Sequence, residues 1–259
     1  KIQCDVCHLN LHKTFAIPHG GGGPGMGPIA VAKHLKDFTP KSAVINYGGK
    51  NGISSISASP WGSGLILTIS YAYIKLLGSK GLRKCTEIAI LNANYLKNLL
   101  EKDYPILYEG KNGTIAHEMI IDCRVFKEKG ITVADIAKRL MDYGFHAPTV
   151  SWPVAGTMMI EPTESESKDS LDKFYEEMCL IKKEIESIKD KGNNILTNAP
   201  HTQDLIAMSN WEYPYSRNQA VFPTKWTKNN KYWPTVRRVN EVQGDRNLIC
   251  SCAAIEDYQ

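Results

Sequence analysis

Two adjacent basic side chains near the beginning of the sequence, His12 and Lys13, are followed by a glycine-rich loop, HGGGGPGMGP, at positions 19–28. A lysine amine binds phosphate as a cation or, when neutral, attacks a carbonyl carbon as a nucleophile. Consecutive glycines leave backbone amides unshielded and permit positive φ, so such a loop can approach an anion very closely. The residue types and their spacing therefore indicate phosphate binding, amine chemistry, or both.

Three interpretations of this stretch compete. A P-loop is excluded, because the lysine precedes the glycines and no Gly-Lys-Ser or Gly-Lys-Thr follows them. The second interpretation is a glycine-rich turn without a chemical role, in which Lys13 is an ordinary solvated side chain. The third is a lysine that forms a Schiff base with a carbonyl compound. The residues of this stretch alone leave the last two open.

A longer set of motifs resembles one protein family. The segment from His8 through the glycine loop is similar to the pyridoxal-phosphate (PLP) lysine segment of the glycine decarboxylase P-proteins, which belong to the glycine cleavage system. Three further motifs match this family, namely SPWGS at 59–63, GFHAPT at 144–149 and EPTESE at 161–166. The resemblance extends over nearly the whole chain. It implies an α/β fold of the fold-type-I PLP-dependent transferase kind, comprising the end of the large PLP domain and a smaller C-terminal α/β domain.

The resemblance also implies a reaction, that of a PLP-dependent oxidoreductase acting on glycine. Lys13 would hold PLP until the amino group of glycine displaces it, and PLP would draw electrons from the bond between the α-carbon and the carboxylate. Carbon dioxide would leave, and the aminomethyl group would pass to the lipoyl group of a separate carrier, the H-protein. The family further implies a homodimer, located in the mitochondrion of a eukaryote or the cytoplasm of a bacterium. Two alternatives remain: another fold-type-I PLP lyase or transferase, and a non-catalytic fragment or subunit that needs a partner chain.

The lysine segment supplies the expected cofactor site. The apolar neighbours of Lys13 should desolvate its amine, which must be neutral for part of the time to form an imine. Adjacent residues of an extended chain point in opposite directions, so His12 would reach the phosphate while Lys13 reaches the ring. The glycines would donate amides to the phosphate or merely permit a tight return of the chain. The expected cofactor-binding residues are Asn10, His12, Lys13, Thr14, Gly21, Gly22 and Gly23, with Lys13 also catalytic.

A second group of polar side chains comes from the two later motifs. By resemblance, these residues would line the glycine site or the channel of the lipoyl arm. Thr163 also has a structural explanation as a helix cap, so no catalytic role is expected for it. The group consists of His146, Thr149, Glu161, Thr163 and Glu164.

One departure from the family's pattern concerns the cofactor ring. Fold-type-I enzymes place an acidic residue on the pyridine nitrogen and stack an aromatic or histidine side chain on the ring, and both residues precede the lysine in sequence. Only twelve residues precede Lys13, and Asp5 is too near along the chain to be assigned the acidic role. Because the sequence begins with Lys1, it is expected to be part of a longer polypeptide.

Composition narrows the class of protein. The 259 residues carry a formal charge of +4 with dispersed basic residues, which gives nucleic-acid binding little support. The most apolar run, 65–77, is shorter than the roughly 20 residues that a bilayer span needs, so no membrane partner is expected. Seven cysteines, an odd number, favour a reducing compartment over a disulfide framework. Cys4-x-x-Cys7 has metal-ligand spacing, but the next close pair, Cys250-x-Cys252, is distant in sequence, so no metal site is expected.

Apolar spacing and turn signals predict the elements that would position these residues. The first part of the chain is predicted to contain a strand at 5–11, a buried strand at 29–32, a short helical turn at 33–38, a loop at 41–60, a buried helix at 62–77 and an amphipathic helix at 82–102 with Ile88, Leu91, Tyr95 and Leu99 on its apolar face.

The pattern changes at about residue 104, where strands begin to alternate with amphipathic helices, as is typical of a compact α/β or α+β domain. The predicted elements are strands at 104–108 and 115–122 around a turn at 110–113, a helix from the capping box of Thr132 and Asp135 to Gly144, a strand at 156–161, and a helix from the capping box of Thr163 and Glu166 to Gly192. The predicted domains are 1–103, the end of the large PLP domain with its linking helix; 104–195, the small α/β domain; and 196–259, an irregular arm rich in proline and tryptophan.

Overall fold

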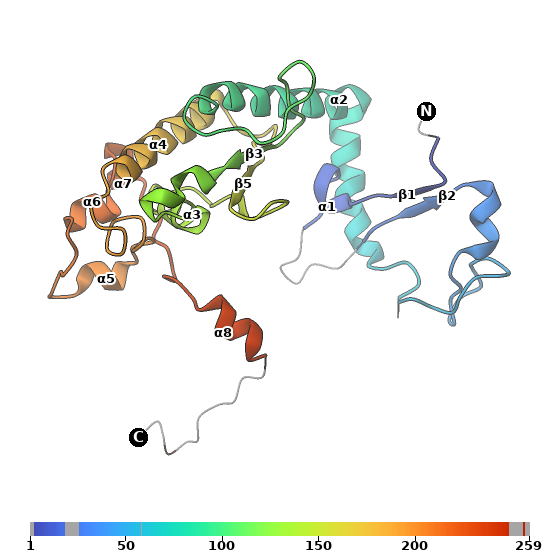
Figure 1. The fold of residues 1–259 in the computed structure, drawn as a ribbon. Helices are drawn as coiled ribbons and strands as arrows, with labels where there is room; N and C mark the ends of the chain where they lie inside the picture. The colour runs from blue at the N-terminus through green and yellow to red at the C-terminus, as the bar shows by residue number, and fades with distance from the viewer. Residues whose placement is uncertain (1–2, 19–25, 58, 249–255, 257–259) are drawn as a thin grey trace. The chain divides into compact units, whose positions relative to one another are not determined.

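The computed structural model describes residues 3–18, 26–57, 59–248 and 256. Contacts between α-carbons divide the chain into two compact units, Lys1–Cys85 and Thr86–Gln259, and each unit is described separately (Figure 1). Three of the expected site residues, Gly21, Gly22 and Gly23, lie outside the described residues, as does the Cys250-x-Cys252 pair.

The first unit contains a small antiparallel strand pair. Strand β1, Val6–His8, pairs with β2, Ile29–Val31, so that Val6 lies opposite Val31 and His8 lies opposite Ile29. Both strands were expected from the sequence, but the prediction that the second is buried is wrong, because Ile29 is 61% exposed. A two-stranded pair has two open faces, and apolar composition alone does not reveal whether anything covers them.

Around the strand pair, some of the predicted elements are present and one differs. The helical turn α1 spans Leu11–Thr14, where the sequence indicated the end of a strand. The 3₁₀ helix η1 spans Lys33–Phe38, as predicted, and the chain from 41 to 60 contains neither helix nor strand among its described residues.

One long helix belongs partly to the first unit and partly to the second. After the 3₁₀ turn η2, Gly64–Ile66, helix α2 runs from Leu67 to Leu100, with a break at Gly78, whose φ of 62° and ψ of −178° are not helical. The two predicted helices are therefore two parts of one element (Figure 1). The helix predicted at 62–77 is not buried as expected, because Leu65 of η2 and Leu76 of α2 are 81% and 86% exposed.

The second part of α2 packs on the core of the second unit through a face that overlaps the predicted one only in part, since Tyr95 packs beside the core. Ala93, Leu96 and Leu100 are buried, whereas Leu91 of the predicted face is 66% exposed. The buried stripe lies one residue further along, which is a rotation of about 100° around the helix axis. Two apolar stripes lie side by side on this helix, and the tertiary partner selects one of them.

The second unit is built on a three-stranded antiparallel sheet. Strands β3 (Met119–Asp122), β5 (Thr157–Ile160) and β4 (Thr149–Val150) lie in the order β3-β5-β4. Helix α3, Val133–Asp142, packs against α4, Lys168–Glu186. The apolar faces predicted for these two helices are confirmed, since their fully or nearly fully buried side chains include Ile136, Leu140, Leu171, Met178, Ile181 and Ile185.

The segment before β3 forms less strand than predicted. Of the expected strand at 104–108, only an isolated bridge between Ile106 and Ile121 is present, supported by a bond from Leu107 N to Ile120 O of 2.8 Å. Pro105 has no amide hydrogen to donate, which limits pairing here. The predicted turn is confirmed, because Gly113 N donates to Gly110 O at 3.0 Å.

One of the two predicted capping boxes is confirmed and the other is wrong. Thr132 and Asp135 bond reciprocally at the start of α3. The 3₁₀ helix η3, Cys123–Lys129, comes just before this cap in the chain. Helix α4 is capped instead by Ser167, whose hydroxyl accepts from Ser170 N at 3.1 Å, and it ends at Glu186 rather than Gly192. The segment offers both T-x-x-E and S-x-x-S signals, and the apolar stripe that starts at Leu171 favours the later one.

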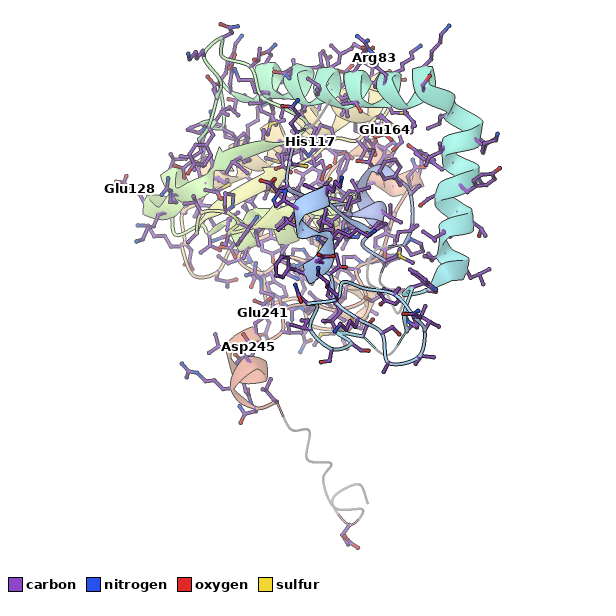
Figure 2. All side chains as sticks on the ribbon, turned by 90° about the vertical axis from the view of Figure 1, so that its right-hand side faces the viewer. Arg83, His117, Glu128, Glu164, Glu241 and Asp245 are labelled. Atoms are coloured by element: carbon purple, nitrogen blue, oxygen red, sulfur yellow. The ribbon has the colours of Figure 1, made fainter. Side chains whose placement is uncertain are left out.

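The region after 196 was expected to be irregular, and this is correct only in part. It carries four short helices among the described residues, each of five or six residues: α5 (Gln203–Ala207), α6 (Arg217–Val221), α7 (Lys225–Asn229) and α8 (Glu241–Arg246). Capping boxes at Ser216 and Thr224 start α6 and α7. Figure 2 shows Glu241 and Asp245 on α8, a helix without buried residues. Of the helices that the structure describes, none combines the length and apolarity needed to cross a membrane.

Candidate active site

Lys13 lies on the single helical turn α1. Asn10 precedes the turn with extended φ and ψ of −87° and 94°, and Lys13 N donates to Asn10 O at 3.0 Å. Successive residues of a helix point about 100° apart. The expectation that His12 and Lys13 point in opposite directions from an extended chain is therefore wrong, and the two side chains share one broad face of the turn.

An apolar cluster anchors this turn to the following helix. Leu11, Ile17 and Ile66 are buried together, with Phe15 packed beside them. Ser70 Oγ donates to Phe15 O at 2.8 Å, which ties the end of the turn to α2. The apolar side chains thus face Ile66 rather than surrounding the lysine.

The Lys13 side chain itself is exposed. The sequence predicted that its apolar neighbours desolvate it, and in this chain they do not, because Leu11 and Ile17 are buried on the opposite side. The backbone amide of Lys13 is held by its bond to Asn10 O, while the side chain is exposed.

The strand pair closes the glycine-rich connection at its base. Leu9 N donates to Pro28 O at 2.9 Å, so the chain returns beside itself after the loop. A Cβ added to Gly27 would lie 2.7 Å from His8 Nε2, so the histidine ring covers this glycine. Both roles that the sequence offered for the glycines, a tight return of the chain and phosphate binding, stay predictions, because Gly21, Gly22 and Gly23 lie outside the described residues.

The donor set around α1 suits a phosphorylated aldehyde. An accessible primary amine, a hydroxyl on Thr14, an imidazole on His12 and an amide on Asn10 all come from one turn. The amine can bond a carbonyl carbon, and the other three groups can donate hydrogen bonds to phosphate oxygens. The Oδ1 atom of Asp5 lies 3.5 Å from His34 Nε2, and both side chains are largely exposed.

The second unit holds most of the other expected site residues around one cavity of about 490 Å³. His146, Thr149 and Glu161 line this cavity, as the resemblance suggested that they would share a site. Thr163 and Glu164 are not among its lining residues; Glu164 is labelled in Figure 2. Glu166, from the same motif, does line the cavity. We call it the Trp226 cavity; its walls include Phe145, His146, Thr149, Glu161, Glu166, Lys173, Phe174 and Trp226.

Sequence reasoning missed the charged pair in the wall of this cavity. The Lys173 ammonium lies over the Trp226 ring and 5.4 Å from the centre of the Phe145 ring. Its Nζ is 3.5 Å from Glu177 Oε1, one helical turn further along α4. Burial raises the pKa of Glu177 to about 7, although the charge of Lys173 opposes the rise, and burial also lowers the pKa of Lys173. The i,i+4 spacing was visible in the sequence, but it usually marks a solvated pair.

The Glu177 pKa has a consequence for stability against pH. An acid whose pKa is higher in the folded state holds its proton there between pH 4.5 and about 7, so stability falls as pH rises through this interval. The difference corresponds to about 3 kcal/mol at about 1.4 kcal/mol for each tenfold change in acidity. We expect Glu177→Gln to remove this decline relative to the parent chain in urea unfolding at several pH values. Glu176→Gln, on the exposed side of the same turn, should keep it; equal slopes for all three chains would contradict the assignment.

A fully buried arginine on α3 was also missed. Arg139 donates from Nε and Nη2 to both oxygens of Glu184, at 2.9 and 2.7 Å, and from Nη1 to Asp142 at 3.0 Å. It also donates to the carbonyl oxygens of Gln219 and Ala220, at 3.0 and 2.7 Å. The guanidinium is thereby hydrogen-bonded both to α4 and to the region after residue 196, and both partners are distant from α3 in the sequence.

The same network continues through a buried histidine. His201 Nδ1 lies 2.7 Å from Asp142 Oδ2, His201 N donates to Asp142 Oδ1 at 2.7 Å, and His201 Nε2 lies 2.9 Å from the Tyr215 hydroxyl. Burial opposes ionisation of Asp142, but the bond from His201 and the charge of Arg139 outweigh it and lower the pKa of that carboxyl. Arg139, Asp142 and His201 are buried and bond one another or neighbouring groups, so we interpret the network as a structural tie.

Comparisons with known proteins were consistent with one another. The family model described as "Glycine dehydrogenase, C-terminal domain" matches residues 85–201. The chain is 60% identical over 259 residues to the "Glycine dehydrogenase (decarboxylating)" of Christiangramia forsetii and 59% identical over 258 residues to that of Flavobacterium johnsoniae. It is 56% identical over 264 residues to "Glycine dehydrogenase (decarboxylating), mitochondrial" of Dictyostelium discoideum. These matches cover 99–100% of this chain but 27% of each relative, so the chain spans about a quarter of their length.

A solved structure shares the fold. The cysteine desulfurase from Thermococcus onnurineus NA1 superposes with a TM-score of 0.51 at 13% identity, covering 69% of this chain and 47% of that one. At this identity the likeness concerns the fold alone. It confirms the mixed α/β, fold-type-I architecture expected from the sequence, and the matches to the relatives confirm the resemblance on which that expectation rested.

Proposed function

We propose that this chain, which is homologous over its whole length to the glycine dehydrogenases (decarboxylating), is the C-terminal part of a PLP-dependent enzyme that decarboxylates glycine. The observation that carries the proposal is the 60% identity to such a protein along all 259 residues. In the complete protein, the aminomethyl group that remains after carbon dioxide leaves passes to the lipoyl group of the H-protein.

The parts of the chain take the following places in this enzyme. Residues 1–103 form the end of the large PLP domain with its linking helix, 104–195 form the small α/β domain, and 196–259 form the C-terminal arm. Support comes from the family model, which covers 85–201, and from the buried tie between the arm and α3.

Within the lysine segment, each residue has a proposed role. PLP, when bound, supplies an electron sink for the bond that leads to the glycine carboxylate. Lys13 holds the cofactor through its accessible amine and, once displaced, carries protons to and from the glycine α-carbon. Asn10, His12 and Thr14 donate hydrogen bonds to the phosphate, and the amides of Gly21, Gly22 and Gly23 complete its cradle.

The partners and the compartment are proposed from the relatives. Glycine is the substrate, lipoylated H-protein is the carrier, and the complete enzyme is a homodimer. A eukaryotic protein of this kind works in the mitochondrion, as the name of the Dictyostelium relative says of that protein, and a bacterial one in the cytoplasm. The alternatives, another fold-type-I PLP lyase or transferase and a non-catalytic subunit, gain no support from relatives that are named glycine dehydrogenase.

Chemical trapping tests the role of Lys13. Borohydride reduces and fixes the linkage between a lysine and PLP, and peptide mass mapping of the complete protein should then place a pyridoxyl group on Lys13. The exposed amine and its anchored backbone make this lysine the expected site. Lys33 and Lys50 serve as internal controls, and a pyridoxyl group on either of them in place of Lys13 would overturn the proposal.

A further inference from the structure

The Trp226 cavity has the size and the walls of a small-molecule site. Its volume of about 490 Å³ lies within the range of roughly 300–1,000 Å³ that is typical of ligand pockets. The Phe145 and Phe174 rings meet edge to face, with 5.2 Å between their centres, and the Trp226 indole forms a further wall. Flat apolar surfaces of this kind favour a flat apolar ligand.

The position of Trp226 depends on a glycine. Gly144 has φ of +89°, and a Cβ added to it would lie 2.9 Å from the indole Cζ3. The close approach of the ring to this backbone keeps the indole in the cavity wall. The cavity is thus shaped by the backbone at the end of α3.

One cation in this cavity lacks a hydrogen-bond acceptor. The Lys173 Nζ atom is buried, although its side chain as a whole is about a fifth exposed, and it makes no hydrogen bond to the described residues. Its ion-pair partner Glu177 is 3.5 Å away and has its own unbonded, buried oxygen, Oε2. A buried ammonium that meets ring faces and a single carboxylate at 3.5 Å has unused hydrogen-bond donors, which an anion supplied from outside the chain can satisfy.

We propose that the Trp226 cavity binds a small monocarboxylate with a flat apolar body. The carboxylate accepts a hydrogen bond from Lys173, and the apolar body packs between Phe145, Phe174 and Trp226. The lining residues all belong to the second unit, and the proposal does not rest on the proposed function.

The other charged groups of the wall select the charge of the ligand. Glu161 and Glu166 also line the cavity, and they repel a ligand that carries two or three negative charges, such as a phosphate. A ligand that carries only a positive charge would meet Lys173. A single negative charge at one end of an apolar body satisfies both conditions.

Calorimetric titration of the 259-residue chain tests the proposal with three matched probes. These are 3-phenylpropanoate, its neutral amide, and 3-phenylpropylamine, which share one apolar body. We expect the carboxylate to bind at least tenfold more tightly than the amide and the amine not to bind. Lys173→Met, which keeps the apolar stem, should remove the advantage of the carboxylate over the amide, and Lys173→Arg should restore it.

A matched control is available on the same helix. The Lys168 ammonium also lies over an aromatic ring, that of Tyr95 at 5.2 Å, but it pairs with Asp172 at 2.5 Å and does not line the cavity. Lys168→Met should therefore leave all three affinities unchanged. The proposal is overturned if no probe binds, if the three probes bind equally, or if the two methionine variants lose the same affinity.

Discussion

Replacing Lys13 with alanine in the complete protein is expected to lower the exchange of labelled bicarbonate into the carboxyl group of glycine by a thousandfold or more, to an order of magnitude. The amine would be lost both as the anchor of the cofactor and as a carrier of protons, whereas the fold should persist. Lys13 is exposed and its backbone bond to Asn10 O does not need the side chain. The measurement is the exchange rate with lipoylated H-protein at saturating PLP.

Two controls make this result specific. Lys33→Ala, at the start of η1, should leave the exchange rate near that of the parent protein. The 259-residue chain alone should show no exchange and bind PLP weakly, because Asp5 pairs with His34 and the chain spans 27% of its relatives. Exchange by the Lys13→Ala protein at more than a tenth of the parent rate would refute the role of this lysine, and turnover by the isolated chain would refute its place as a part of a larger enzyme.

The second large effect is expected at Arg139, where substitution by methionine should destabilise the second unit by about 3–5 kcal/mol. Methionine fills similar space, but the buried Asp142 and the partly buried Glu184 would lose their cation, and the Gln219 and Ala220 carbonyls would lose their donor. Unfolding in urea, followed by tryptophan fluorescence, measures the change in the free energy of unfolding.

Lys182→Met is the matched control for that experiment. Lys182 also pairs with a carboxylate at 2.8 Å, that of Asp103, but both side chains are about a quarter exposed. Water therefore screens the pair, and its loss should cost at most about 1 kcal/mol. If Arg139→Met costs no more than Lys182→Met, the buried network contributes no more than a surface ion pair.

The sequence predicted the second unit better than the first, for a physical reason. Helices α3 and α4 bury the apolar stripes that their spacing indicated, because both partners of each contact lie within the chain. The first part of α2 is also rich in apolar residues, yet Leu67 and Leu76 are exposed. Apolar periodicity indicates that a face of a helix can be buried, but it does not indicate which surface covers that face.

The site residues show the same division. The resemblance indicated Lys13 and its neighbours as the cofactor site, which stays a prediction. It also suggested that His146, Thr149 and Glu161 share a site, and these three residues line the Trp226 cavity. Lys173 was missed because its ring partner Trp226 lies 53 positions later in the sequence. Arg139 was missed for a similar reason, because Gln219 and Ala220 are 80 and 81 positions away. Contacts of this range leave no periodic trace.

The buried tie between α3 and the region after 196 sets a limit on where the chain can be shortened. The family model ends at residue 201, but a chain cut there would lose Tyr215 and both carbonyls that bond Arg139. Arg238 extends the requirement, since it donates to Ala199 O at 2.7 Å and pairs with Asp135 at 2.7 Å. The smallest autonomously folding second unit should therefore reach at least Arg238, whereas α8, which buries no residue, can be removed without loss of stability.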